Sequence, residues 1–193
     1  MQKKKGIDFD EIFSLAVKMT SIRTILSLVV VEYLHLEQLD VKMAFLHWDL
    51  EEQIYMQQSQ GYEVKGMENL VCMLKKSLYG LKQAPRKWYL KFDNFMIEKI
   101  YSRWHYDHYV YFNMLDNGRY IILLLYVDDM LVAGPNMQDI NVLKRKLAKS
   151  FAMKDLGAAK KILGMRIKRD KKNHKLTLSS GEYKEKVLEM FIM

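Results

Sequence analysis

The most informative pattern of apolar and polar positions lies between residues 121 and 134. An unbroken apolar run at 121–127 is followed by Asp128 and Asp129 and then by a shorter apolar run at 130–133. Short apolar runs bounded by polar residues are typical of buried strands. The pattern therefore predicts a buried β-hairpin that turns at the two aspartates.

The rest of the chain divides into segments with helical or strand periodicity. Apolar residues recur at i, i+3 and i+4 in some segments, which predicts helices, and other segments are short apolar or alternating runs, which predicts strands. Turn residues such as Asp116-Asn117-Gly118 separate neighbouring strands and favour hairpins. We predict helices at 19–33, 85–100 and 136–151 and from Ser179 onwards, and strands at 36–41, 54–56, 71–74, 109–115, 119–127, 162–169 and 175–178.

Three local features refine these elements. Thr20 or Ser21 can cap the first helix, and Asn136 can cap the third. The sequence Asp-Leu-Gly at 155–157 predicts a break in regular structure. On the third helix the apolar residues point inward, so its cations are predicted to form a solvated face: Lys144, Arg145, Lys146 and Lys149.

The adjacent carboxylates of Asp128 and Asp129 are costly beside a core. They must separate, take up protons or share a cation, and hard ions such as Mg²⁺ prefer carboxylate oxygens. The simpler interpretation is a polar hairpin tip in water. A third acid, Asp40, ends the predicted strand at 36–41. If the two strands are adjacent in an antiparallel sheet with helices on one face, the three carboxylates share one rim and suit two-metal phosphoryl transfer.

Composition limits the class of protein. The 193 residues suffice for one domain, and 31 Lys+Arg against 23 Asp+Glu give a net charge of +8. This excess favours a polyanionic partner, either nucleic acid or an acidic membrane surface. Cys72 is the single cysteine, which excludes an internal disulfide and fits a reducing compartment. No apolar run reaches about 18 residues and no signal peptide precedes the chain, so we expect a soluble intracellular protein that does not enter a membrane.

The segment 75–89 mixes five cations with three aromatic residues. Gly80 permits close backbone approach, and Pro85 suits the first turn of a helix. Cations interleaved with stacking surfaces fit a nucleotide or a nucleic-acid strand. An amphipathic helix with a solvated basic side explains the same pattern.

Three separated motifs resemble one family. They are Leu-Asp-Val-Lys-x-Ala-Phe-Leu at 39–46, Ser-Leu-Tyr-Gly-Leu-Lys-Gln-Ala-Pro-Arg-x-Trp-Tyr at 77–89 and Tyr-Val-Asp-Asp at 126–129. In this order the motifs closely resemble the reverse transcriptase of copia-type LTR retrotransposons, from about residue 7 to 193. The resemblance implies an α+β fold: a polymerase palm, built as a ferredoxin-like antiparallel sheet with helices on one face, with partial fingers and the start of a thumb.

The resemblance also implies an RNA-directed DNA polymerase that uses two Mg²⁺ or Mn²⁺ ions, dNTPs and an RNA or DNA template-primer. By motif, Asp40, Asp128 and Asp129 are the catalytic residues and metal ligands, and the carbonyl of Val41 is a further ligand. Phe45 is implied to block a ribose 2′-hydroxyl, although a plain core aromatic explains it too. Lys154 is a candidate proton donor to pyrophosphate. The implied nucleotide-binding residues are Phe45, Tyr79, Gly80 and Lys82, and those for nucleic acid are Lys75, Lys76, Arg86, Lys87 and Tyr126.

The chain departs from the family pattern in two ways that keep a second hypothesis open. The family usually has a basic fingers strand just upstream of the position of residues 5–8, and the sequence begins after it. Trp48 stands where the family generally has glycine. We therefore expect one incomplete reverse transcriptase domain at 1–193, without RNase H, integrase or protease regions, from a larger Pol polyprotein of cytoplasmic particles or the nucleus. The alternative is an inactive retrotransposon remnant, at most a basic nucleic-acid-binding module.

Overall fold

The computed structural model describes residues 17–42, 53–67, 69–76, 78, 81, 83–116, 118–181, 189 and 190. The chain divides into two compact units. One consists of Met1–Lys42 with Asp93–Met193, and the other of Met43–Phe92. The larger unit contains Asp40, Asp128 and Asp129.

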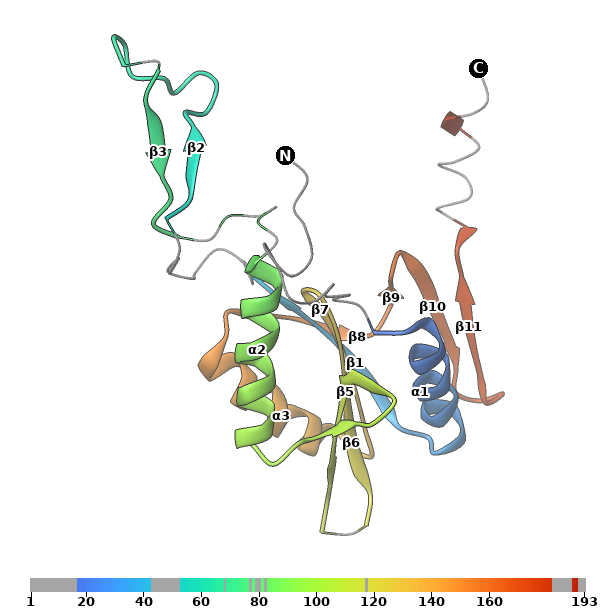
Figure 1. The fold of residues 1–193 in the computed structure, drawn as a ribbon. Coiled ribbons are helices and arrows are strands. Elements are labelled where there is room, and N and C mark those ends of the chain that lie inside the picture. The colour runs from blue at the N-terminus through green and yellow to red at the C-terminus, as the bar shows by residue number, and fades with distance from the viewer. Residues whose placement is uncertain are drawn as a thin grey trace. The chain divides into compact units, whose positions relative to one another are not determined.

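A six-stranded sheet forms the centre of the larger unit (Figure 1). Its strands lie in the order β4-β5-β6-β7-β1-β8, and each neighbouring pair is antiparallel. The hairpins predicted around Asp116-Asn117-Gly118 and around Asp128 and Asp129 are confirmed, because β5, β6 and β7 are successive neighbours, and the strand that carries Asp40 lies beside β7. The bounds are β1 His35–Val41, β4 Ser102–Trp104, β5 Asp107–Met114, β6 Tyr120–Tyr126, β7 Asp129–Gly134 and β8 Met153–Ala158.

Helices α1 (Met19–Val31), α2 (Gln83–Glu98) and α3 (Met137–Ser150) alternate with these strands. With β2–β3 and β4–β5 set aside as insertions, the remaining elements β1, α2, β6, β7, α3 and β8 follow the order β-α-β-β-α-β. Because β1 and β7 are antiparallel neighbours, the C-terminal end of β1 and the N-terminal end of β7 lie side by side. This end of the central strands, called the edge of the sheet below, carries the aspartates.

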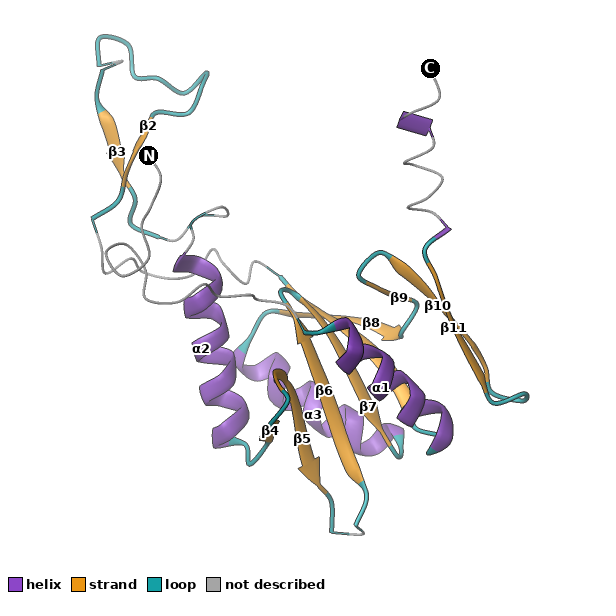
Figure 2. Cartoon of the chain, turned by 45° about the vertical axis from the view of Figure 1, so that its right-hand side comes forward, coloured by secondary structure: helices purple, strands orange, loops and turns teal. Residues whose placement is uncertain are grey.

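The helices cover both faces of the sheet, so the expectation of helices on one face is wrong. On one face, α1 packs its buried Ile22 and Leu26 against alternate residues of the sheet such as Leu124 and Leu131. On the other face lie α3 and the second half of α2, where the rings of Phe95 and Phe151 are 5.1 Å apart. Figure 2 shows α1 and α3 on opposite sides of the strands. The central strands are therefore buried on both faces, which explains their continuous apolar sequences.

Two predicted helices end earlier than their apolar periodicity suggests. Tyr33 and Ile100 have φ angles of 55° and 66° and are exposed. Leu34 donates its backbone N–H to the carbonyl of Val29, and Tyr101 donates to that of Met96. This is the Schellman pattern of helix termination, which usually uses glycine. Because no glycine marks either end, the apolar periodicity did not reveal these terminations.

The first and third helices begin differently. Asn136 caps α3 as predicted, accepting a hydrogen bond from the backbone N–H of Asp139. The cap predicted for α1 is wrong, because α1 follows Lys18 without a side-chain cap from its own neighbours. Asp107 of β5 supplies it instead, accepting hydrogen bonds from the backbone of Lys18 at 2.8 Å and from Ser21 Oγ at 2.6 Å.

After α3 the chain forms more strands than predicted. Residues 155–157 lie within β8 and do not break regular structure. A second sheet has the order β11-β10-β9, with β9 at Lys161–Ile162, β10 at Met165–Asp170 and β11 at Lys175–Ser179. The predicted strands at 162–169 and 175–178 are thus confirmed in outline. The helix predicted from Ser179 lies largely outside the described residues.

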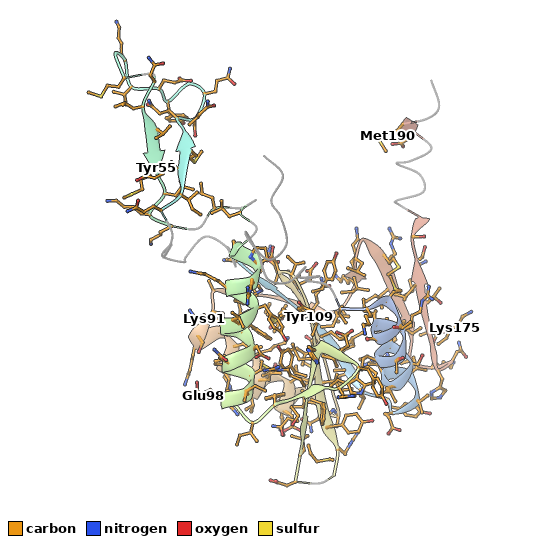
Figure 3. The ribbon with its side chains drawn as sticks, viewed as in Figure 1. Tyr55, Lys91, Glu98, Tyr109, Lys175 and Met190 are labelled. Atoms are coloured by element: carbon orange, nitrogen blue, oxygen red, sulfur yellow. The ribbon has the colours of Figure 1, made fainter. Side chains whose placement is uncertain are left out.

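A buried carboxylate ties the second half of α2 to the sheet. Asp93 is 3% exposed, and its carboxylate accepts hydrogen bonds from Tyr111 Oη at 3.0 Å and from Arg103 Nη2 at 2.6 Å. Arg103 Nε also lies 2.6 Å from Asp93 Oδ1. Figure 3 labels Glu98 at the end of this helix and Tyr109 in the strand that carries Tyr111. Buried charges require such partners.

The smaller unit contains the predicted hairpin of β2 (Tyr55–Gln57) and β3 (Val71–Met73), which is confirmed. Gln58 organises the loop between them: its Nε2 donates to the carbonyls of Met67 and Leu70, and its Oε1 accepts from the backbone N–H of Val64. The first half of α2 buries apolar residues including Trp88. Within the described residues, no helix is long and apolar enough to cross a membrane.

Candidate active site

A row of four side chains crosses the sheet at the end of β1. Tyr126 of β6 pairs with Asp129 of β7, Asp129 pairs with Asp40 of β1, and Asp40 pairs with Lys154 of β8. Directly opposite residues of antiparallel strands project from the same face. The row therefore brings two carboxylates, an aromatic ring and a cation side by side.

Asp128 belongs to the tight turn that joins β6 to β7. The turn consists of Val127 and Asp128, and Val127 has a φ of 55°, which is unusual for a β-branched residue. The backbone N–H of Val41 donates to the carbonyl of Asp128 at 2.9 Å, which fixes the turn against the end of β1. Strained backbone of this kind persists where surrounding structure holds it, often at functional sites.

Burial and mutual repulsion disfavour the ionised forms of Asp128 and Asp129 at this edge. Burial, and then the charges of Asp40 and Asp129, raise the pKa of Asp128 from 3.8 to about 6. Burial also raises the pKa of Asp129, although a hydrogen bond from Gln38 Nε2, at 3.4 Å from Asp129 Oδ1, opposes that rise. The Oδ1 atom of Asp128 is buried and has no hydrogen-bond partner among the residues that the structure describes.

These residues fit a divalent cation by their chemistry. Clustered carboxylate oxygens are preferred ligands of Mg²⁺, and an orphaned carboxylate oxygen in a buried position is stabilised by a cation. Among the described residues, no three His, Cys, Asp or Glu side chains lie close enough to enclose a metal ion. The carboxylates of Asp40, Asp128 and Asp129 are therefore close to one another at this edge without surrounding a common point.

The other candidate residues are distributed between the two units. In the smaller unit Lys75, Lys76 and Arg86 are exposed, and Lys87 is partly buried. Tyr126 lies in the larger unit at one end of the four-residue row. Phe45, Tyr79, Gly80 and Lys82, together with Trp48, lie outside the described residues.

Sequence reasoning missed two residues near this edge. Gln38 is two positions before Asp40 on the same face of β1, and this alternation was the available signal for its contact with Asp129. Lys144 was predicted to be solvated, and this prediction is wrong, because the residue is 9% exposed and bonded to Glu37 and Asp155. Its position was the available signal, because Lys144 lies four residues after Ile140 and three before Leu147, on the buried face of α3.

Comparison with known proteins decides the family. A family model described as reverse transcriptase (RNA-dependent DNA polymerase) matches residues 1–193. The chain belongs to this family.

Its relatives are copia-type transposon polyproteins. This reverse transcriptase family member is 59% identical, over 192 residues, to the retrovirus-related Pol polyprotein from transposon TNT 1-94 of Nicotiana tabacum, matching 100% of its own length and 14% of that polyprotein. It is 36% identical over 168 residues to the Pol polyprotein from transposon RE1 of Arabidopsis thaliana, covering 86% and 11% of the two chains. A putative transposon Ty5-1 protein of Saccharomyces cerevisiae is 36% identical over 145 residues, covering 75% and 46%.

The chain therefore spans a small part of the polyproteins it matches. No solved structure matches this reverse transcriptase family member.

The raised pKa of Asp128 predicts that its charge destabilises the metal-free fold. The folded group holds its proton up to a pH of about 6, whereas the unfolded group loses it near 3.8, so stability falls as the pH rises between these values. Asp128→Asn removes this loss. Because the carboxylate is partly solvated, we expect a stabilisation of about 1–2 kcal/mol at pH 8 that vanishes at pH 4.

Urea unfolding of both proteins in EDTA at the two pH values measures this difference. An equal effect of Asp128→Asn at both pH values would show that the carboxylate's charge is not the cause.

Proposed function

We propose that this chain is the RNA-directed DNA polymerase domain of a copia-like retrotransposon and adds nucleotides to a primer 3′-hydroxyl. The observation that carries the proposal is the sheet edge where Asp40, Asp128 and Asp129 meet, in a chain of the reverse transcriptase family. Asp128 Oδ1 is buried there without a hydrogen-bond partner in the described part of the chain. A bound cation would offset the repulsion among these three carboxylates.

The topology supports an assignment of parts. We assign the larger unit to a ferredoxin-like palm, because its β-α-β-β-α-β order places the half-buried carboxylates at one end of the central strands. The smaller unit is assigned to part of the fingers, and the region from β11 onwards to the start of a thumb. The domain would act within a larger Pol polyprotein, in cytoplasmic particles or the nucleus.

Asp40, Asp128, Asp129 and the carbonyl of Val41 would hold two Mg²⁺ or Mn²⁺ ions. When bound, such ions lower the pKa of an attacking hydroxyl and offset charge on the transferred phosphoryl group. In the reaction the primer 3′-hydroxyl loses its proton to solvent, its oxygen bonds to the α-phosphorus of a dNTP, and the bond from that phosphorus to the bridging oxygen of pyrophosphate breaks. The carboxylates would hold the ions beside the attacking and leaving oxygens.

Two further residues of the row would act on the reactants. Lys154, opposite Asp40, would donate a proton to an oxygen of the departing pyrophosphate. Tyr126, next to Asp129, would contact the end of the primer. Phe45, Tyr79, Gly80 and Lys82 would bind the nucleotide, and Lys75, Lys76, Arg86 and Lys87 the nucleic-acid backbone.

Lys154→Met tests the proton donor. We expect kcat for nucleotide addition to fall about 10-fold, because water can replace the lysine only poorly as an acid, with KM for dNTP nearly unchanged. Single-turnover primer extension over a range of pH measures both constants. An unchanged kcat, with Lys146→Met as a control for loss of an exposed lysine, would exclude Lys154 from this role.

Phe45→Ala tests the sugar gate. A smaller side chain leaves room for a ribose 2′-hydroxyl, so we expect the preference for dNTP over rNTP to fall about 10-fold. The ratio of the two kcat/KM values gives this preference. If the ratio does not move, Phe45 is a core aromatic without a role in sugar selection.

The proposal is tested by primer extension on an RNA template with a DNA primer, followed by sequencing of the product. We expect Mg²⁺-dependent products complementary to the template and abolished by EDTA. Salt-sensitive binding of the primer-template without any extension would instead establish the alternative, an inactive remnant that binds nucleic acid.

A further inference from the structure

Lys144 is a buried cation held by two strands. Its Nζ donates to Glu37 Oε2 at 2.8 Å and to the two carboxylate oxygens of Asp155 at 2.8 and 2.9 Å. Burial alone lowers the pKa of this lysine, but the hydrogen bonds that it donates to Asp155 and Glu37, together with the negative charges of these residues, raise the pKa overall. Lys144 therefore keeps its charge inside the protein. A long side chain on a surface helix can usually reach water, so this inward position reflects its two partners.

Asp155 also shapes the pairing of β8 with β1. Its Oδ1 accepts a hydrogen bond from the backbone N–H of Gly157 at 2.9 Å, and Gly157 has a φ of 71°. The register shifts here: Leu39 pairs with Asp155 while Gln38 pairs with Gly157. Leu156 is thus the extra residue of a β-bulge. Bulges of this kind re-aim the side chains on either side of them.

Lys144 and the four-residue row lie on opposite faces of β8. Successive strand residues point to opposite faces, so Lys154 shares the face of Asp40, whereas Asp155 shares the face of Glu37 and α3. We propose that Lys144 is a positioning residue, which holds Glu37 of β1 and Asp155 of β8 and so fixes the bulged register that sets Lys154 opposite Asp40. The inference rests on the proposed function only for its kinetic consequence.

A slip of one residue shows why the register matters. If β8 paired without its bulge, every side chain on one side of Leu156 would change face. Lys154 would then leave the row, while the remaining strands of the sheet would keep their pairing. Loss of the Lys144 contacts should therefore alter β8 selectively.

Two variants separate positioning from folding. Lys144→Met removes the cation but leaves Glu37 buried without its partner, which endangers folding. The double variant Lys144→Met with Glu37→Gln removes that unpaired charge and keeps the same volume. Lys146→Met is the matched control, because Lys146 is exposed on the same helix.

The first readout is amide hydrogen exchange in the full chain, which needs no enzymatic activity. Two amides report on the β1–β8 ladder: Ala159 donates to the carbonyl of Leu36 at 3.1 Å, and Lys42 donates to that of Ala152 at 2.8 Å. The amide of Val41, which donates to Asp128, reports on the other side of β1. We expect the two ladder amides to exchange about 10-fold faster in the double variant, with that of Val41 and all amides of Lys146→Met unchanged.

The second readout is single-turnover extension. We expect the double variant to lower kcat by no more than Lys154→Met does, with KM for dNTP unchanged, and to add no further loss when combined with Lys154→Met. Wild-type exchange rates at Ala159 and Lys42 would overturn the positioning role, even if extension itself were absent. Fully additive losses of kcat would overturn its link to Lys154.

Discussion

Asp128→Asn should reduce Mg²⁺-dependent primer extension by about 1,000-fold. Asparagine preserves the shape of the side chain and removes one negative charge from the edge where Asp40 and Asp129 also lie. Loss of one group that stabilises charge during transfer typically costs about 10²–10³-fold, and the metal-binding role proposed for Asp128 places the expected loss at the upper end of that range. The measurement is single-turnover extension with wild-type and variant proteins at matched concentrations.

Asp116→Asn provides the control for this substitution. Asp116 is exposed in the turn between β5 and β6, and its replacement removes the same charge far along the strands from the site. We expect it to retain full activity. Activity of Asp128→Asn within a few-fold of wild type would exclude Asp128 from the chemistry.

Arg103→Met should lower the free energy of unfolding by about 2–3 kcal/mol. The substitution leaves the carboxylate of Asp93 buried and without its cation, while the hydrogen bond from Tyr111 remains. Breaking a fully buried ion pair typically costs about 3–5 kcal/mol, and the partial exposure of Arg103 reduces that figure. Urea unfolding at pH 7, followed by circular dichroism, measures the change.

Two further variants identify the cause. Arg23→Met removes an exposed arginine from α1 and should change stability by less than about 0.5 kcal/mol. Adding Asp93→Asn to Arg103→Met removes the unpaired charge and should restore part of the loss. No recovery in the double variant would mean that Arg103 acts through packing and not through Asp93.

The hairpin of β6 and β7 and the strand ending on Asp40 could be predicted because their information is local. A long apolar run interrupted by two acids fixes both strands and the turn between them. The adjacency of Asp40 and Asp129 followed from a physical argument about shared cations, and the register of β1 with β7 agrees with it. Family membership added roles that periodicity alone does not contain.

Features that depend on distant contacts were not predictable from the pattern. The spacing of Lys144 places it on the buried face of α3, but its partners Glu37 and Asp155 come from β1 and β8, and no local pattern identifies them. The Asp-Leu-Gly sequence at 155–157 resembles a break, yet Gly157 allows a bulge inside a strand. The position of α1 opposite α3 depends on which side of the sheet the chain crosses, a choice that local sequence does not specify.

The central claim is that Asp40, Asp128 and Asp129 bind divalent cations. The complex for this measurement contains the purified chain, a dNTP and a primer-template whose primer lacks a 3′-hydroxyl, so that no extension occurs. Electron paramagnetic resonance during a titration with Mn²⁺ then measures the binding directly. We expect saturable binding by the wild type and by Asp116→Asn, and an affinity at least 10-fold weaker for Asp128→Asn. Equal Mn²⁺ affinity in all three proteins would contradict the account.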